Sequence, residues 1–505
     1  MDKKNGLNGT NGMSKKKKKN FFSSVSFGLL LIIVVLSLVM ITRPAQQNPV
    51  FPNGESYHNL RIAEALKQHL SLTQDPVQET VYEPNPYHYL LALLLIIIPV
   101  ELLSIYLPLL LGVLCGFIFY RLILLMGVKP KNAAYAIIIL SVTPAFIVLF
   151  TGLYVLGFVI LLSLLSLLLA LKKKKTFQTF CTVLCTLLFI LLALTSLTGF
   201  ILTILILLIL CLGLKKKIRV FYVPVIISVI AAFLLTFLTN YVPRILGFHS
   251  FAFQNILSLL SAPIGFDIFL LVLFITGFIV FWINKKEKRL FHLAVLGLLI
   301  FSLFNIVLRA YASFIITVYM AVAISYFFNR KWDLKVIKKG TLLLVLCSLV
   351  FSLINQASML VDAQPDKEMQ QALVFFNGLS KGKTLALEKD GFLIEFYSGK
   401  NVLLDSNSYL VPGYKDIKND SSNLFGFVRL KEAEPILHKH SIRYILLTPY
   451  MKQELWENQE QGLWFLVRNS DSFVKKYVEQ DIEIWEYAPV DQDAINLNET
   501  NEVLT

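Results

Sequence analysis

Long apolar runs alternate with short polar segments through the first 356 residues of the chain. A helix needs about 20 predominantly apolar residues to cross the hydrocarbon core of a bilayer, and most of these runs reach that length. The pattern therefore predicts a polytopic α-helical membrane protein. We predict eleven spans, near residues 21–42, 102–125, 132–151, 153–171, 176–195, 198–214, 219–239, 266–284, 290–308, 310–328 and 340–356.

Two helical segments in the region between the first two spans are not expected to cross the membrane. Residues 89–99 are apolar but too short to span, so we interpret them as a dipping or interfacial helix. Residues 59–70 place Leu60, Ala63 and Leu66 on one face, which predicts an amphipathic helix lying on the bilayer or on the spans. Both would belong to a first external loop, residues 43–101.

The pattern changes after residue 356, where shorter helical and strand-like segments alternate. We expect helices at 366–379 and 431–440, strands at 384–387, 401–404 and 442–447, and a two-strand unit at 473–487. That alternation predicts a mixed α/β domain. The predicted organisation is a cytoplasmic basic tail at 1–20, a transmembrane domain at 21–356, an external domain at 357–490 and an acidic disordered tail at 491–505.

A net charge of +14 by itself suggests a nucleic-acid-binding protein, but the distribution of the charge along the chain excludes that class of protein. Residues 1–356 carry 32 basic and ten acidic side chains, a balance of +22, whereas residues 357–505 carry 15 and 23, a balance of −8. The basic residues stand in clusters between the apolar runs, as the positive-inside rule describes. We therefore expect a multi-pass protein of the cell membrane with a cytoplasmic amino terminus and an extracytoplasmic carboxy-terminal domain.

The positions of the ten acidic residues among the first 356 predict that any chemistry takes place at the outer surface of the membrane. None falls in the middle of a predicted span, which argues against a proton-relay transporter or an ion pump. Five of them lie between Glu55 and Glu83, in the first external loop. Glu55 precedes the amphipathic helix and could act as a general base or metal ligand, assisted by His58. The alternative is that Ser56 and Glu55 cap the helix and fix the loop.

The stretch GESYHNLRIAEAL, residues 54–66, resembles the first-external-loop signature of GT-C membrane glycosyltransferases. The resemblance is strongest to archaeal oligosaccharyltransferase catalytic subunits and their uncharacterised relatives, which also have many spans and an external mixed α/β domain. It implies transfer of a sugar from a polyprenyl-phosphate donor to a glycan, lipid or protein acceptor at the outer membrane face. Glu55 is then the candidate catalytic acid.

The same resemblance implies a divalent cation, Mg²⁺ or Mn²⁺, near Glu55. Glu55 alone is a poor metal site, so Asp75, Glu83 or donor phosphate oxygens would complete it. The donor phosphate in turn needs a cation at the outer surface.

Arg309, which we expect in a turn between two spans, is the first candidate for that cation. GT-C enzymes often have an arginine in a comparable late-span turn for the lipid phosphate, which supports this assignment. Arg244, His249 and Arg61 are alternates. The competing interpretation of Arg309 is an interfacial anchor whose side chain snorkels.

Two departures from the oligosaccharyltransferase pattern narrow the expected activity. The turn at residues 143–154 carries no second carboxylate, and the chain contains no Trp-Trp-Asp-Tyr-Gly motif. A single-sugar GT-C transferase fits better than transfer of a glycan to asparagine. The alternatives are a catalytically degenerate relative that binds lipid-linked sugar or scaffolds a membrane complex, a transporter or flippase, and a structural membrane protein.

Overall fold

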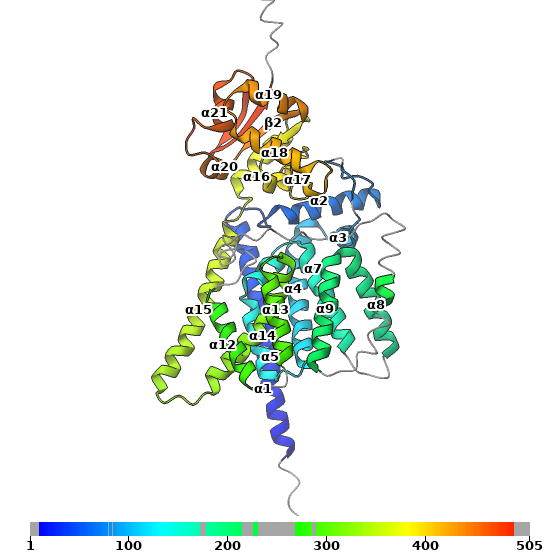
Figure 1. The fold of residues 1–505 in the computed structure, drawn as a ribbon, viewed down its shortest axis with the longest axis vertical. Helices are drawn as coiled ribbons and strands as arrows, with labels where there is room; N and C mark the ends of the chain where they lie inside the picture. Colours follow the sequence, from blue (N-terminus) through cyan, green and yellow to red (C-terminus); the bar gives the residue numbers. More distant parts are fainter. Residues whose placement is uncertain are drawn as a thin grey trace, which may run out of the picture. The chain divides into compact units, whose positions relative to one another are not determined.

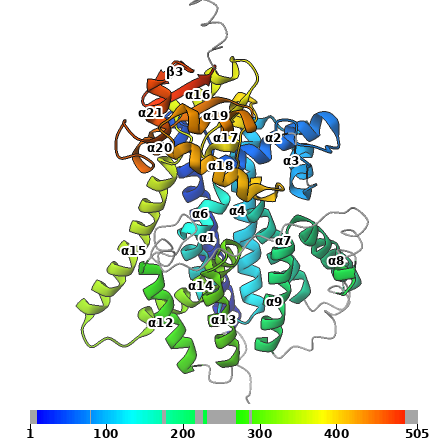
Figure 2. The same ribbon diagram turned by 45° about the horizontal axis from the view of Figure 1, so that its top comes forward.

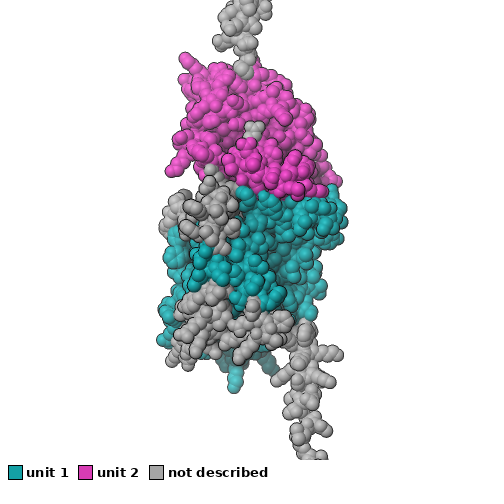
Figure 3. Space-filling model, turned by 90° about the vertical axis from the view of Figure 1, so that its right-hand side faces the viewer, with its two compact units in different colours: residues 1–45, 84–362 teal, residues 46–83, 363–505 magenta. Residues whose placement is uncertain are grey.

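The computed structural model describes residues 10–78, 80–82, 84–171, 178–214, 226–230, 268–284 and 289–488. The chain forms two compact units, coloured teal and magenta in Figure 3. Unit 1 comprises residues 1–45 and 84–362, and unit 2 comprises residues 46–83 and 363–505. Most of the region between the first two apolar runs is therefore grouped with the carboxy-terminal segment.

Unit 1 is built from helices (Figure 1). Their bounds are α1 Thr10–Ala45, α3 Pro86–Ile97, α4 Val100–Leu125, α5 Pro130–Ser141, α6 Pro144–Phe150, α7 Val155–Leu171, α8 Gln178–Thr195, α9 Leu197–Leu214, α12 Ile268–Asn284, α13 Arg289–Ser302, α14 Ile306–Asn329 and α15 Lys335–Val361.

A helical membrane unit is confirmed, whereas eleven spans stays a prediction. In the described ranges, four helices are long and apolar enough to cross a bilayer: the Val25–Ala45 part of α1, α4, α14 and α15. The bent pair α5 and α6 would make a fifth. Other apolar helices, such as α7 and α12, are shorter. The predicted span at 219–239 lies largely outside the described residues.

The predicted span at 132–151 is broken in two. Helices α5 and α6 meet at an angle of 66°. The break falls at Thr143 and Pro144, where α6 begins. Proline has no backbone N–H to donate, and its ring disfavours the helical conformation of the preceding residue. The stretch predicted as one span is therefore a bent pair of helices.

The short apolar segment before α4 forms a separate helix, as predicted. Helix α3 has 12 residues, begins after the N-cap Asn85 and ends before Pro99. Its Tyr87 is fully buried, with its ring centroid 5.2 Å from that of Phe158 in α7. The segment is thus too short to span and packs on the helices of its own unit.

Helix α14 contacts α5, α6, α9, α12, α13 and α15 within unit 1. Figure 2 shows it beside α12 and α13. Its first residues are positioned by Asn305, whose side-chain oxygen accepts from the backbone N–H groups of Val307 and Leu308 at 2.9 and 3.2 Å. Because of this N-cap the helix begins at Ile306. Arg309 therefore lies in the first turn of α14 and not in an inter-span turn, which corrects the predicted boundary.

Unit 2 combines α2, which comes from the loop after α1, with the carboxy-terminal elements. Its sheet has the order β1-β2-β4-β3, with β1 and β2 parallel and the other pairs antiparallel. The main elements are α2 Gly54–His69, α16 Lys367–Asn377, β1 Lys383–Leu385, α17 Gly391–Ser398, α18 Tyr414–Gly426, α19 Leu430–Lys439, β2 Ile442–Leu447, α20 Pro449–Glu454, α21 Gly462–Asn469, β3 Phe473–Glu479 and β4 Ile482–Tyr487.

The strand β2 forms the centre of the unit 2 core. Ile445 and Leu447 are fully buried and belong to an apolar interior that includes Trp456 and Trp485. The predicted strand at 401–404 is reduced to one parallel bridge, Thr384 to Val402. It stops there because Asp405 turns the chain by accepting hydrogen bonds from Asn407 and Ser408.

Candidate functional site

Glu55 lies in the first turn of α2, in unit 2. The cap of this helix is Asn53, whose side-chain oxygen accepts from the Ser56 N–H at 3.0 Å. Neither Ser56 nor Glu55 therefore supplies the N-cap. The Glu55 side chain is half-buried.

His58 lies one turn further along α2 and is buried. Its ring stacks on Phe392 of α17, with centroids 4.3 Å apart. Nδ1 lies 3.4 Å from Nη2 of Arg61, and Nε2 lies 3.2 Å from Nδ2 of Asn407. These contacts hold the imidazole in the interior of unit 2 and favour a positioning role for His58.

Arg61 joins the loop segment of unit 2 to its carboxy-terminal segment. Its Nη1 donates to Oδ1 of Asp75 at 2.5 Å, and its Nη2 donates to Oδ2 of Asp75 at 2.8 Å and to Oε2 of Glu395 at 2.7 Å. The side chains of Arg61 and Asp75 are 9% exposed and that of Glu395 is 0% exposed. This network favours a structural role for Arg61 over the predicted role in phosphate binding.

One guanidinium in this network faces two carboxylates in direct contact and a third, Asp405, nearby. Burial opposes ionisation of Asp75, but the hydrogen bond and charge of Arg61 outweigh it and lower the pKa of Asp75. Burial of Glu395, only partly offset by Arg61, raises its pKa to about 8. The cluster therefore holds a proton on Glu395 near neutral pH.

Of the acids predicted to hold a divalent cation, Asp75 is engaged in hydrogen bonds through both of its carboxylate oxygens. Both oxygens of Asp75 accept from Arg61, and Oδ1 also accepts from the backbone of Val77 and Gln78. Glu83, like Arg244 and His249, lies outside the described residues. Within the described ranges, no group of three or more His, Cys, Asp or Glu side chains could hold a metal. The arrangement does not fit Asp75 as a ligand.

Arg309 occupies the first turn of α14 in unit 1, half-buried. Its Nη2 lies 3.4 Å from the carbonyl oxygen of Leu303. The N-terminus of a helix presents backbone N–H groups and a partial positive charge. Arg309 and the start of α14 therefore place two sources of positive potential at one end of that helix.

Sequence reasoning missed Arg43 and Glu395, whose side chains are both buried. Arg43, at the end of α1, is fully buried and donates from Nη1 to the carbonyl oxygens of Leu360 and Val361 at 2.7 and 3.0 Å, at the end of α15. Glu395 sits in an apolar stretch whose pattern gives no sign of an ion pair with a residue of α2. For Arg43, the only available signal was a single arginine closing the first apolar run.

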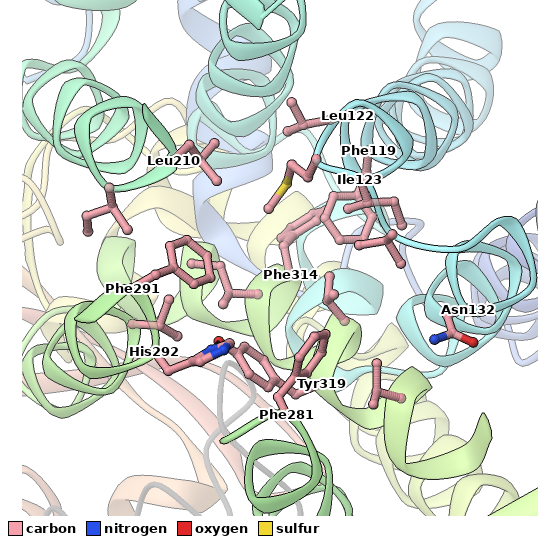
Figure 4. Close-up of a pocket in the computed structure, with 18 of the residues that line it drawn as sticks. Phe119, Leu122, Ile123, Asn132, Leu210, Phe281, Phe291, His292, Phe314 and Tyr319 are labelled. Atoms are coloured by element: carbon pink, nitrogen blue, oxygen red, sulfur yellow. Dashed lines mark hydrogen bonds between the residues drawn. The ribbon is translucent and has the colours of Figure 1, made fainter. Parts of the chain in front are cut away.

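Unit 1 also contains an apolar cavity of about 480 Å³ among α4, α9, α12, α13 and α14 (Figure 4). Phe119, Leu210 and Phe314 contribute to its walls. His292 Nδ1 and the Tyr319 hydroxyl, also in the wall, form a hydrogen bond of 2.9 Å. Sequence reasoning did not predict this cavity.

Comparison with solved structures identifies the fold. Over 92% of this chain and 75% of the other, it matches the Archaeoglobus fulgidus oligosaccharyltransferase tethered with an acceptor peptide, with a TM-score of 0.57 and 13% identity. Over 93% of this chain and 99% of the other, it matches ArnT from Cupriavidus metallidurans bound to undecaprenyl phosphate, with a TM-score of 0.55 and 12% identity. The chain has a GT-C fold. This confirms the resemblance drawn from residues 54–66 and from the order of the segments.

Further structures of Archaeoglobus fulgidus oligosaccharyltransferase also match this chain. The same archaeal enzyme has been solved with an inhibitory peptide and a dolichol-phosphate, and with zinc and sulfate. By sequence, no protein-family model and no curated protein matches the chain. The similarity of this chain to these enzymes is therefore a similarity of fold.

Proposed function

We propose that this protein is a membrane glycosyltransferase that transfers a sugar from a polyprenyl-phosphate carrier to an acceptor at the outer membrane face. The observation that carries the proposal is the GT-C fold, shared along nearly the whole chain with an enzyme solved with dolichol-phosphate and with one solved with undecaprenyl phosphate. The acceptor class, whether glycan, lipid or protein, is left open by the residues considered above.

We assign Glu55 the role of general base. Its side chain is half-buried in the first turn of α2, the helix that carries the sequence motif. In the proposed step an acceptor hydroxyl attacks the anomeric carbon of the sugar, and the bond from that carbon to the phosphate oxygen breaks. The electron pair leaves with the polyprenyl phosphate, and the acceptor proton passes to Glu55.

We assign Arg309 the role of binding the phosphate of the donor. The negative charge on the phosphate increases as the carbon–oxygen bond breaks, so a guanidinium stabilises the departing group more than the ground state. The half-buried position of Arg309 at the start of α14 supports this role, since partial desolvation strengthens a charge-assisted hydrogen bond. A divalent cation would supply the same stabilisation, but the described residues offer no complete ligand set for one.

A transfer assay tests Glu55 against a matched control. Purified wild-type protein, Glu55→Gln and Glu64→Gln would be incubated with undecaprenyl phosphate carrying tritiated glucose, mannose or galactose, in the presence of membrane lipid and glycan acceptors. Glu64 lies on the same helix but is exposed. We expect Glu55→Gln to lower kcat by about 10²- to 10⁴-fold, as for loss of a general base, and Glu64→Gln to leave it unchanged. Equal activity of Glu55→Gln and wild type would exclude the assignment.

A second candidate function is binding of lipid-linked sugar without transfer. The burial of His58, Arg61 and Asp75 in one hydrogen-bonded network favours it, because these polar residues of the loop serve the packing of unit 2. This alternative predicts that wild-type protein retains undecaprenyl phosphate but transfers no label in the same assay.

A further inference from the structure

One face of α14 borders the apolar cavity of unit 1 over much of the helix length. Tyr311, Phe314, Val318, Val322 and Ser325 follow one another at intervals of three and four residues and all line it. At 1.5 Å per residue this face extends for about 20 Å. The cavity volume of about 480 Å³ falls within the range of ligand pockets. The cavity is therefore long as well as large enough for a ligand.

The interior of the cavity suits a hydrocarbon chain. Phe119 and Ile123 of α4, Leu210 of α9 and Phe291 of α13 line it (Figure 4). His292 Nδ1 and the Tyr319 hydroxyl are joined by a hydrogen bond of 2.9 Å. Filling such a volume with an apolar chain removes apolar surface from water and restores dispersion contacts to the walls.

One end of the cavity is polar and basic. Lys129, Asn132 and Ser325 line it there, and the exposed side chain of Lys129 carries a positive charge. A second pocket of about 300 Å³ shares Asn132, Val322 and Ser325 with the first and adds Arg330 and Asn329. The two pockets therefore adjoin, and the apolar cavity opens toward two cations and two side-chain amides.

This basic end is distinct from the end of α14 that carries Arg309. Arg330 follows Arg309 by 21 positions along the chain, which corresponds to about 30 Å of helix, close to the thickness of a bilayer core. Residues 330–339 include five lysines and arginines besides one acid, Asp333. By the positive-inside pattern, this end faces the leaflet opposite to the proposed transfer reaction.

We propose that unit 1 binds an anionic phospholipid at this end, with one acyl chain in the cavity and the phosphate at Lys129 and Arg330. A free phosphate would leave the apolar volume unfilled, and a zwitterionic lipid would offset the field of the two cations with its own positive charge. An anionic lipid fits both the apolar cavity, through its acyl chain, and the basic end, through its headgroup. Juxtamembrane Lys and Arg side chains attract such headgroups. This site is separate from the proposed donor site at Arg309.

Native mass spectrometry of the full-length protein from nanodiscs tests the proposal. The discs would contain phosphatidylglycerol and phosphatidylcholine with identical acyl chains in equal amounts, and retained lipid would be counted as detergent and collision energy increase. We expect wild-type protein to retain phosphatidylglycerol in preference, and Lys129→Gln with Arg330→Gln to weaken that retention about tenfold. Lys335→Gln, an exposed lysine that does not line either pocket, should retain it as wild type does.

A second variant tests the cavity itself. Val322 lines both pockets, so Val322→Trp should block their junction and reduce phosphatidylglycerol retention while the two cations remain. Equal retention of the two lipids by wild type would overturn the proposal without bearing on sugar transfer. Equal losses of phosphatidylglycerol retention in Lys335→Gln and the double variant would also overturn it. Displacement of the bound lipid by millimolar inorganic phosphate would do the same. The wild-type comparison stands even where a variant fails to fold.

Discussion

Arg61 is held by carboxyl groups from two separate stretches of the sequence. Asp75 lies 14 positions away in the chain, and Glu395 lies 334 positions away. Removing one partner from a buried ion pair strands the other charge, which costs about 3–5 kcal/mol. The residues of α2 that most resemble a catalytic motif therefore also hold unit 2 together.

The proton on Glu395 makes the stability of unit 2 dependent on pH. The pKa of Glu395 is about 8 in the folded protein and near its usual value of 4.5 when unfolded, so between these values the folded state holds an extra proton. The stability that this proton contributes to the folded state is fully present below about pH 4.5 and is lost as pH rises through about 8. We expect the thermal unfolding midpoint of wild type to fall from pH 5.5 to 8.5, and Glu395→Gln to flatten that fall.

The measurement is tryptophan fluorescence during heating of the full-length protein in detergent. Glu388→Gln is the matched control, because Glu388 pairs with Lys418 at the surface of the same unit. That variant should keep the wild-type pH slope. If Glu395→Gln and wild type lose stability in parallel over this range, Glu395 is ionised throughout and the assignment of the proton is wrong.

Residue roles were only partly accessible from the sequence. The motif around Glu55 and the resemblance that it carries are local, so they could be recognised in one stretch of chain. The partners Glu395, Asn407 and Phe392 could not, because nothing in a sequence of spaced apolar and polar residues indicates which distant segment covers His58 and Arg61. The roles assigned to Glu55 and Arg309 stay predictions.

At the scale of elements, capping residues and strong periodicity were the reliable signals. The helix expected at 366–379 begins after its N-cap Asp366 and ends at Gly378, and the strand expected at 442–447 has those bounds. Weak signals failed: α17 was not predicted, and 401–404 forms only a bridge because a strand requires neighbours that the local sequence does not specify.

A glycine of α12 sets how closely it approaches α14. A Cβ atom at Gly277 would lie 2.0 Å from the backbone carbonyl oxygen of Tyr319, so alanine would force the two helices apart. We expect Gly277→Ala to destabilise the protein by about 1–3 kcal/mol. Gly297 of α13 has no heavy atom within 4 Å of the same position, so Gly297→Ala should be neutral or stabilise by up to about 1 kcal/mol.

Thermal unfolding of the two alanine variants, followed in detergent beside wild type, distinguishes these effects. The expected result is a lower unfolding midpoint for Gly277→Ala alone. Equal midpoints for the two variants would mean that α12 and α14 are not in close backbone contact, and the packing around Tyr319 would need revision.

At the scale of the whole molecule, each compact unit is assembled from two separate stretches of the chain. Unit 1 receives α1 and then residues 84–362, while unit 2 receives the intervening loop and the carboxy-terminal segment. The pattern of apolar runs and basic clusters indicates where helices can cross a membrane, which explains why a polytopic helical membrane protein could be predicted. It does not indicate that residues 46–83 pack with a segment about 300 positions later.

We propose that this protein binds a polyprenyl phosphate through Arg309. Cryo-electron microscopy of the full-length protein in nanodiscs containing undecaprenyl phosphate is the direct test of this role. We expect phosphate density within hydrogen-bonding distance of the Arg309 guanidinium, about 2.7–2.9 Å from nitrogen to oxygen, and loss of that density in Arg309→Gln. Phosphate density away from Arg309 in wild type, or unchanged density in the variant, would rule this role out.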